Sequence, residues 1–266
     1  MKQKWWILLT LLLCGCGASS QPDQTGAVQN DRPRLSASTE ETAENVAAVE
    51  KNENLEKNPS NSNQNPGEGQ NWTVFAMDTV MQFDAYGGSA NLQEKVKRRV
   101  EELEGELSTT QENSDIFYLN QEKTAKLSDD TRYLMQEALA LGAETDGALD
   151  ISIYPVVQSW GFTTGNYRVP SESERESLLK SVDYRLVGLE ADTASIEPGM
   201  MVDLGGVGKG FTGDEVVKTM KEDGVTSALF SLGGNIQTIG TKPDGEKWYV
   251  GIKDPESDGY LGGVRV

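Results

Sequence analysis

The chain has 266 residues and a formal net charge of −18, from 24 Lys and Arg against 42 Asp and Glu. This excess of negative charge argues against nucleic acid as a partner and against electrostatic adhesion to anionic lipid. The sequence contains no histidine, and no cysteine after residue 16. A Ser-His-Asp triad, thiol catalysis, disulfides and the usual zinc ligand sets are therefore excluded.

Residues 1–16 have the pattern of an export signal. Two lysines precede a short apolar run that ends in Leu13-Cys14-Gly15-Cys16. The run is too short to span a membrane, because a span needs about 20 apolar residues. The order Leu, small residue, Gly, Cys resembles the bacterial lipobox, so we expect cleavage before Cys16 and lipidation of Cys16. The alternative is a plain secretory signal. Either way the protein is expected to be extracytoplasmic, and the lipid would anchor it to the cell membrane.

Residues 17–70 are rich in Ser, Asn, Gln, Glu, Thr and Pro and contain hardly any large apolar side chain. Such a segment cannot bury enough apolar surface to offset the entropy lost on ordering, so we predict a disordered tether. A tether with lipid at one end would hold a domain away from a membrane surface. Residues 71–266 are then left for one folded domain with a substantial core.

This domain is predicted to mix strands and helices. The expected helices are 92–107, where apolar residues recur at helical spacing, 128–142, with Ser128 as N-cap, and 211–222. The expected strands are 73–86, 184–189, 195–196, 227–239 and 248–252, with a buried apolar run at 149–157 that closes at Pro155. Because several strands follow one another without an intervening helix, we predict an α+β fold with a mixed or antiparallel sheet and packed helices.

Two further groups of residues are interpreted as structural. The segment Trp160-Gly161-Phe162 is expected to pack in the core. Four glutamates of the first predicted helix, Glu101, Glu102, Glu104 and Glu106, are expected to form a solvated helix face rather than a metal cluster.

The most informative motif is the glycine-rich run 203–210, Asp-Leu-Gly-Gly-Val-Gly-Lys-Gly, which leads into the third predicted helix. Glycines let a backbone pass close to a ligand, and the free N–H groups of a helix start together with Lys209 suit a phosphate. The run is not a P-loop, because position 210 is Gly where that motif needs Ser or Thr. A turn that needs glycine only for packing is the alternative. In so acidic a chain a polyphosphate site would need a cation, and Mg²⁺ is the natural choice.

Seven short motifs occur in order over residues 71–252: Met77-Asp78-Thr79, Leu107-Ser108-Thr109, 113–120, Asp146-Gly147-Ala148-Leu149-Asp150, 155–162, 203–210 and Leu232-Gly233-Gly234-Asn235-Ile236. Together they resemble the ApbE family of lipoprotein FAD:protein FMN transferases. The resemblance implies a T-fold-like domain that binds FAD and Mg²⁺. It also implies FAD-contact positions at Met77, Thr110, Ala148, Leu149, Asp150, Asp203 and Lys209, and a metal ligand in the backbone carbonyl of Gly206. Two alternatives stay open: Met77 as a core methionine, and Asp150 as the cap of a turn.

The resemblance implies that FAD is split at its pyrophosphate, AMP is released, and FMN is attached to a Thr or Ser of a partner flavoprotein. That acceptor would be a membrane redox-pump subunit or a lipoprotein with an FMN-binding domain. The nucleophile belongs to the acceptor, so no catalytic residue is assigned in this chain. In the family the domain continues beyond the segment that ends here at Val266, and the continuation carries further FAD and metal contacts, so we expect a C-terminally truncated chain. A non-catalytic FAD-binding lipoprotein, as a scavenger or chaperone, and a solute-binding lipoprotein are the alternative functions.

Overall fold

The computed structural model describes residues 69–266. The predicted signal peptide, the lipidation site Cys16 and the tether up to residue 68 lie outside the described residues. Runs of strands and runs of helices follow one another in the described part, and each strand ladder there is antiparallel. The predicted α+β fold is therefore confirmed.

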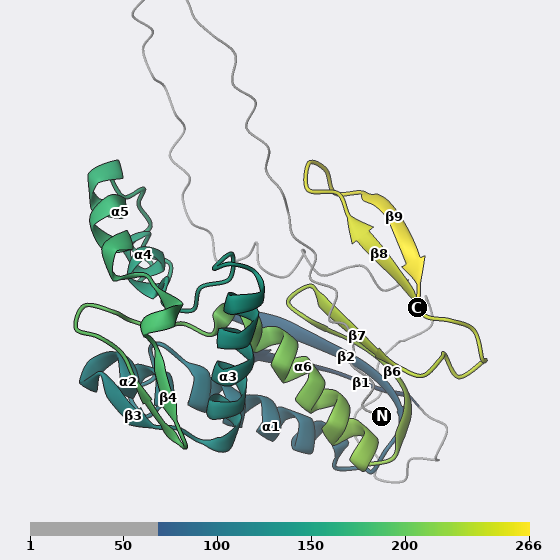
Figure 1. The fold of residues 1–266 in the computed structure, drawn as a ribbon. Coiled ribbons are helices and arrows are strands. Elements are labelled where there is room, and N and C mark those ends of the chain that lie inside the picture. The colour runs from purple at the N-terminus through teal and green to yellow at the C-terminus, as the bar shows by residue number, and fades with distance from the viewer. Residues whose placement is uncertain (1–68) are drawn as a thin grey trace, which may run out of the picture. The chain divides into compact units, whose positions relative to one another are not determined.

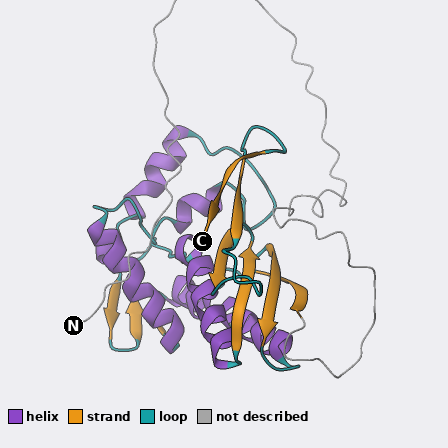
Figure 2. Ribbon diagram, turned by 90° about the vertical axis from the view of Figure 1, so that its right-hand side faces the viewer, coloured by secondary structure: helices purple, strands orange, loops and turns teal. Residues whose placement is uncertain are grey.

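A four-stranded antiparallel sheet and two long helices form the larger layer pair. The strand order is β1-β2-β6-β7, with β1 Gly69–Ala76, β2 Thr79–Gly87, β6 Val225–Leu232 and β7 Asn235–Ile239. Helices α1 (Leu92–Leu107) and α6 (Gly205–Glu222) lie side by side along this sheet (Figure 1). Turned by 90°, the strands of this sheet form one layer and the helices beside them another (Figure 2).

Two of the strands predicted from the sequence are hairpins instead. Residues 73–86 were expected as one strand, but the chain reverses at Met77 and Asp78, whose φ angles are 50° and 56°. Left-handed backbone costs roughly 1–2 kcal/mol at each non-glycine residue, so Met-Asp gives no turn signal in the sequence. The expected strand 227–239 likewise folds back at Gly233 and Gly234, both with positive φ.

The two longest helices of the prediction are close to the structure. Helix α1 has the predicted bounds, with Leu92, Val96, Val100 and Leu103 buried at intervals of three or four. Helix α3 (Asp129–Glu144) has Ser128 as its N-cap, since the Ser128 hydroxyl accepts from the Thr131 N–H at 3.2 Å. It continues two residues beyond Gly142.

The smaller elements were predicted less well. The three-stranded sheet β3-β5-β4 consists of β3 Thr124–Lys126, β5 Thr193–Ser195 and β4 Gly188–Glu190. Helix α2 (Asp115–Glu122) precedes it, and α4 (Tyr154–Ser159), α5 (Glu172–Leu178), η1 (Leu179–Ser181) and η2 (Tyr184–Leu186) follow α3. The expected strand 184–189 is a 3₁₀ turn over its first three residues, and its last two, Gly188 and Leu189, lie in β4. Pro155 lies in the first turn of α4, where proline is tolerated, and does not close a buried run.

The C-terminal hairpin contains β8 (Tyr249–Lys253) and β9 (Tyr260–Arg265), which pair with one another. Trp248, just before β8, is buried. The core position expected for Trp160-Gly161-Phe162 is wrong for Phe162, which is 60% exposed and stacks on Trp160. None of the helices between residues 69 and 266 combines the length and apolar character needed to cross a membrane.

Two hydrophobic clusters form the core, and both long helices contribute to each. One cluster gathers α2, α3, the small sheet and the C-terminal end of α1, and the other fills the space between the large sheet and the helices. Leu204 at the start of α6 belongs to the first cluster, and Val216 and Met220 near its end belong to the second. Met77, at the tip of the β1–β2 hairpin, packs against both clusters.

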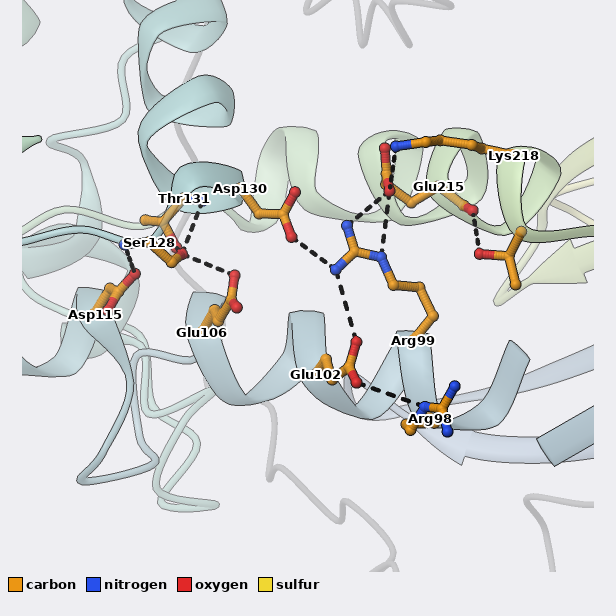
Figure 3. Close-up of polar contacts among 11 residues, drawn as sticks. Arg98, Arg99, Glu102, Glu106, Asp115, Ser128, Asp130, Thr131, Glu215 and Lys218 are labelled. Atoms are coloured by element: carbon orange, nitrogen blue, oxygen red, sulfur yellow. Dashed lines mark hydrogen bonds and ion pairs between the residues drawn. The ribbon is translucent and has the colours of Figure 1, made fainter. Parts of the chain in front are cut away.

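A polar seam joins α1, α3 and α6 (Figure 3). The Arg99 guanidinium lies 2.7 Å from a carboxylate oxygen of Asp130 and 2.7 Å from one of Glu215. The hydrogen bond with Asp130 is the main cause that raises the pKa of Arg99 above its ordinary range. Because one cation faces carboxylates from two other helices, the seam fixes the relative position of all three.

Two of the four glutamates expected on a solvated face of α1 are half-buried and have partners. Glu106 accepts a hydrogen bond from the Ser128 hydroxyl at 2.8 Å, and Glu104 accepts one from the Met77 N–H at 2.7 Å. The interpretation as a uniformly solvated face is therefore wrong for Glu104 and Glu106.

The chain that leads into α6 is held by the amide of Asn120 on α2. The Asn120 side chain, 3% exposed, donates to the Val202 carbonyl at 2.8 Å and accepts from the Val202 N–H at 2.7 Å. Lys123 adds a bond from its ammonium to the Met200 carbonyl at 3.0 Å, and burial lowers its pKa. Both backbone groups of Val202 are thus satisfied by one side chain, as a neighbouring strand would do.

We expect Asn120→Ala to lower the free energy of unfolding by about 2–4 kcal/mol, because it leaves a buried N–H and a buried carbonyl of Val202 without partners. Urea denaturation measures this value. Asn113→Ala, at an exposed position just before α2, is the matched control and should change it by less than about 0.5 kcal/mol. Equal effects of the two substitutions would contradict the role given to Asn120.

Glu106 should make stability depend on pH. Burial is the main cause that raises its pKa, so the folded state binds the proton more tightly than the unfolded chain does. Its contribution is favourable at low pH and is lost as pH rises from about 4.3, the ordinary Glu value, through the raised value. Over that range we expect the wild type to lose stability relative to Glu106→Gln, whose amide oxygen still accepts from Ser128. Urea denaturation across a pH series measures the difference, with Glu101→Gln on the exposed side of α1 as control. Parallel pH profiles for the wild type and Glu106→Gln would refute it.

Candidate functional site

The glycine-rich run 203–210 is the beginning of α6 rather than a loop. The helix starts at Gly205, six residues before the predicted start at residue 211. The Asp203 carboxylate accepts from the Gly205 N–H at 2.7 Å, and the Asp203 N–H donates to the Ile151 carbonyl at 2.8 Å. Asp203 therefore satisfies one of the N–H groups that every helix start leaves without an intrahelical acceptor.

Lys209 lies one turn into α6, four residues after Gly205. Residues four apart share a face of a helix, and side chains lean toward its N-terminus, so Lys209 extends toward the first turn. Gly205 and Gly206 are exposed there and present no side chain. Lys209 is half-buried, and no hydrogen-bond or ion-pair partner for it occurs among residues 69–266. The N–H groups of Val207 and Gly208 donate to the Leu204 carbonyl, which leaves the Gly206 N–H without an acceptor among residues 69–266. In a chain with a net charge of −18, a cation with no partner in that range beside this N–H favours an anionic ligand.

Met77 reaches the same helix from the tip of the β1–β2 hairpin. Its sulfur accepts a hydrogen bond at 3.5 Å from the hydroxyl of Thr212, which is fully buried and three residues beyond Lys209. The tip of the β6–β7 hairpin lies next to it, because the Gly233 N–H donates to the Val80 carbonyl at 3.2 Å. A Cβ on Gly233 would lie 2.2 Å from the Thr79 hydroxyl oxygen, so only glycine fits between the two tips.

The segment Ala148–Asp150 runs along the other side of the helix start. A Cβ built on Gly206 would lie 3.6 Å from a methyl carbon of Leu149, so these two residues are neighbours. Asp150 accepts from the N–H and hydroxyl of Ser152 at 2.8 and 2.6 Å, and from the Tyr184 N–H at 3.0 Å. Its carboxylate thus ties together two loops, which agrees with the alternative of a turn cap. A contact between Asp150 and a nucleotide stays a prediction.

An open hollow of about 290 Å³ lies beside this segment. Its walls come from the end of α3 and from the chain around η2, and its lining residues are Asp146, Gly147, Asp150, Val182, Asp183, Tyr184 and Arg185. Asp183 and Arg185 pair with each other at 2.7 Å on the rim. The hollow adjoins the Ala148–Asp150 segment and does not include Asp203, Gly206 or Lys209.

The predicted FAD contacts thus fall into two groups. Met77, Leu149, Asp203, Gly206 and Lys209 gather around the first two to three turns of α6, with Ala148 and Asp150 flanking Leu149. Thr110 follows the C-terminal end of α1, is exposed, and makes its polar contacts with Ser108. Leu107 connects the two groups, since it lies 4.0 Å from the Cβ position of Gly208. Contact of each of these residues with FAD stays a prediction.

The predicted magnesium ligand lies in the first turn of α6. A carbonyl at the position of Gly206 normally accepts the N–H four residues on, and its second lone pair stays open. Within residues 69–266 no three His, Cys, Asp or Glu side chains gather to hold a metal ion. Mg²⁺ is commonly bound by one or two protein oxygens, several waters and the phosphates of a substrate. The described residues therefore fit Mg²⁺ only as an ion shared with a bound phosphate group.

Three residues that organise the site were not singled out from the sequence. Asn120 falls inside the motif 113–120, Thr212 belongs to none of the motifs, and the sequence predicts a solvated position for Glu104. Buried polar residues inside a helical pattern are the signal that could have marked Asn120 and Thr212. Nothing local to Glu104 indicates that its carboxylate turns toward a hairpin 27 residues earlier.

The fold and site define an α+β domain whose central helix begins with exposed glycines and a lysine that has no partner among residues 69–266, an arrangement suited to an anionic ligand. A family model described as the ApbE family matches residues 77–266, which is more than two thirds of the chain. The chain therefore belongs to the ApbE family.

Curated relatives carry the name FAD:protein FMN transferase. The protein of Vibrio cholerae O395 is 29% identical over 176 residues, 64% of this chain and 53% of that protein. The protein of Escherichia coli K12 is 27% identical over 198 residues, 71% of this chain and 56% of that protein. The chain thus spans about half the length of the curated relatives it matches.

Solved structures agree with the assignment. The ApbE protein of Thermotoga maritima superimposes with a TM-score of 0.70 at 26% identity, over 75% of this chain and 68% of that chain. The flavin transferase ApbE of Vibrio cholerae gives a TM-score of 0.67 at 26% identity, over 74% and 68%.

The exposed glycines of α6 should reduce its stability. We expect Gly206→Ala to raise the free energy of unfolding by about 0.5–1 kcal/mol, because its backbone is helical and a new Cβ meets only Leu149 at an ordinary contact distance. Urea denaturation checks the value.

Gly233→Ala is the matched control for this prediction. Its φ is positive and the new Cβ would overlap the Thr79 side chain, so it should destabilise by more than about 1 kcal/mol. A destabilised Gly206→Ala would mean that position 206 does not have the helical environment described above.

Proposed function

We propose that this protein is a FAD:protein FMN transferase. The hydroxyl oxygen of a Thr or Ser in an acceptor flavoprotein attacks the phosphorus of the FMN half of FAD. A phosphoester bond to FMN forms, the pyrophosphate bond breaks, the hydroxyl proton is released, and AMP leaves. Membership of the ApbE family and the names of the relatives support this proposal.

The observation that carries the proposal is the start of α6. Lys209 is a half-buried cation without a partner in the described part of the chain, and it leans over the first turn of α6, where the Gly206 N–H has no acceptor among the described residues. A pyrophosphate there would take charge-assisted hydrogen bonds from the ammonium and the backbone. Neutralising the charge that develops on the transferred phosphoryl group is the main contribution a protein makes to such a reaction.

The negative charge of Asp203 favours a second cation, in addition to Lys209, for binding a phosphate. Its carboxylate lies at the same helix start and repels a phosphate that approaches the first turn of α6. A Mg²⁺ ion held by phosphate oxygens and the Gly206 carbonyl would neutralise the pyrophosphate. The chain's own residues would bind and orient the nucleotide. Leu149 lies next to the exposed backbone of Gly206, and Met77 lies at the edge of the site.

The acceptor and the location complete the proposal. We propose lipidation at Cys16, anchoring of the protein to the outer side of the cell membrane, and transfer to a flavoprotein exposed on that side, such as a redox-pump subunit or an FMN-binding-domain lipoprotein. The lipobox-like sequence before Cys16 is the support for this location.

FAD titration with and without Mg²⁺ tests the binding step. We expect the wild type to bind FAD, more tightly with Mg²⁺, and Lys209→Ala to weaken binding about ten- to hundred-fold, the usual value of one charge-assisted hydrogen bond. Lys221→Ala, at an exposed position in the last turn of the same helix, is the matched control and should leave the affinity unchanged. Equal effects of the two substitutions would remove the role given to the start of α6.

The transfer step has its own test. The wild type is incubated with FAD, Mg²⁺ and an acceptor domain that a known transferase can modify, and covalent flavin fluorescence is followed on a denaturing gel. Labelled acceptor together with released AMP supports the transferase. FAD binding without labelling favours a non-catalytic FAD-binding protein, and absence of both favours a solute-binding protein.

A further inference from the structure

We infer that Glu104 is a positioning residue of the candidate flavin site, which fixes the Met77–Asp78 turn against α6. The inference rests on the proposed function for its consequence in FAD binding. The placement of the turn itself can be tested without FAD.

The turn is poorly suited to hold its own shape. It is a two-residue connection between Ala76 of β1 and Thr79 of β2, and both of its central residues have positive φ. Such turns are favoured by Asn-Gly and Asp-Gly, where glycine accepts left-handed backbone without strain. Here the second central residue is Asp78, so neither position is glycine.

An external contact supplies what the local sequence lacks. The Glu104 carboxylate accepts the Met77 N–H at 2.7 Å, and a charged acceptor makes this bond stronger than one between neutral groups. Glu104 lies on α1, whose position relative to α6 is fixed by the Arg99 contact with Glu215. The position of the Met77–Asp78 turn is therefore fixed relative to α6, the helix that carries Lys209.

The contact has a consequence for the Met77 side chain. The sulfur of Met77 accepts from the buried Thr212 hydroxyl, one helical turn beyond Lys209. Glu104 holds the backbone of Met77 and Thr212 contacts its side chain, so Met77 is fixed at two points. If the turn is released, Met77 can leave the face of α6 on which the ligand is expected to lie.

The first experiment measures amide hydrogen exchange at Met77 in the full chain by NMR. We expect Glu104→Ala to accelerate exchange at Met77 at least about ten-fold while the amides of β6 stay protected. Glu104→Gln keeps an acceptor oxygen, so its exchange rate at Met77 should lie between those of the wild type and Glu104→Ala. Glu101→Ala, which loses only an exposed pair with Lys97 on the same helix, is the matched control and should leave Met77 unchanged. Unchanged exchange at Met77 in folded Glu104→Ala overturns the inference.

The second experiment measures FAD affinity in the same variants and adds Asp78→Gly. We expect Glu104→Ala to raise the dissociation constant about ten-fold. In Glu104→Ala/Asp78→Gly most of the affinity should return, because glycine holds the positive φ without Glu104. If Glu104 had a purely structural role, Glu104→Ala and the double variant would lose the same thermal stability. The double variant would then not regain FAD affinity.

The two experiments separate the two proposals. If the wild type does not bind FAD but exchange at Met77 is still accelerated in Glu104→Ala, the proposed function is contradicted and the inference about Glu104 is not. If the wild type and Glu104→Ala bind FAD equally well, the inference about Glu104 is contradicted and the proposed function is not.

Discussion

The amide of Asn120 is the contact on which the candidate site depends most. It pairs with both backbone groups of Val202, and the next residue, Asp203, takes the first N–H of α6. A helix that begins with two glycines has little tendency to start at a defined residue by itself. Two side chains from outside the helix, or just before it, therefore decide where α6 begins and which of its groups face outward.

From this start α6 packs against both hydrophobic clusters. Ion pairs fix its position relative to α1 and α3. Arg99 lies between Asp130 and Glu215, so α1, α3 and α6 keep one relative arrangement (Figure 3). The Met77 turn joins the same arrangement at the place where the two clusters meet. The residues that reach the start of α6 from distant parts of the sequence, such as Met77 and Leu149, lie in turns or bends. Side chains on helices, Glu104 of α1 and Thr212 of α6, hold the Met77 turn in place.

The sequence predicts the parts of this fold that have a regular period or a strong local signal. Helix α1 has a clear apolar repeat and α3 has a serine cap, and both were located well. The hairpin at Met77–Asp78 was missed because its turn contains neither glycine nor asparagine, and the early start of α6 was missed because glycines argue against a helix. The motif order marked the residues around α6. Their arrangement depends on Asn120, Thr212 and Glu104, whose partners lie 27 to 135 residues away and leave no local trace.

The glycines of α6 have a consequence for how any ligand would be held there. Five of its 18 residues are glycines, all within the first nine positions, and each disfavours the helical state by about 1 kcal/mol relative to alanine. Intrinsic propensity therefore favours the helical state only weakly in that half, so we expect ligand binding there to order it further. Part of the interaction energy is then spent on lost backbone entropy, so the affinity reflects the rigidity of the empty site as well as its contacts. A stiffer first turn and a looser one can present the same atoms and still bind the same nucleotide with different strength.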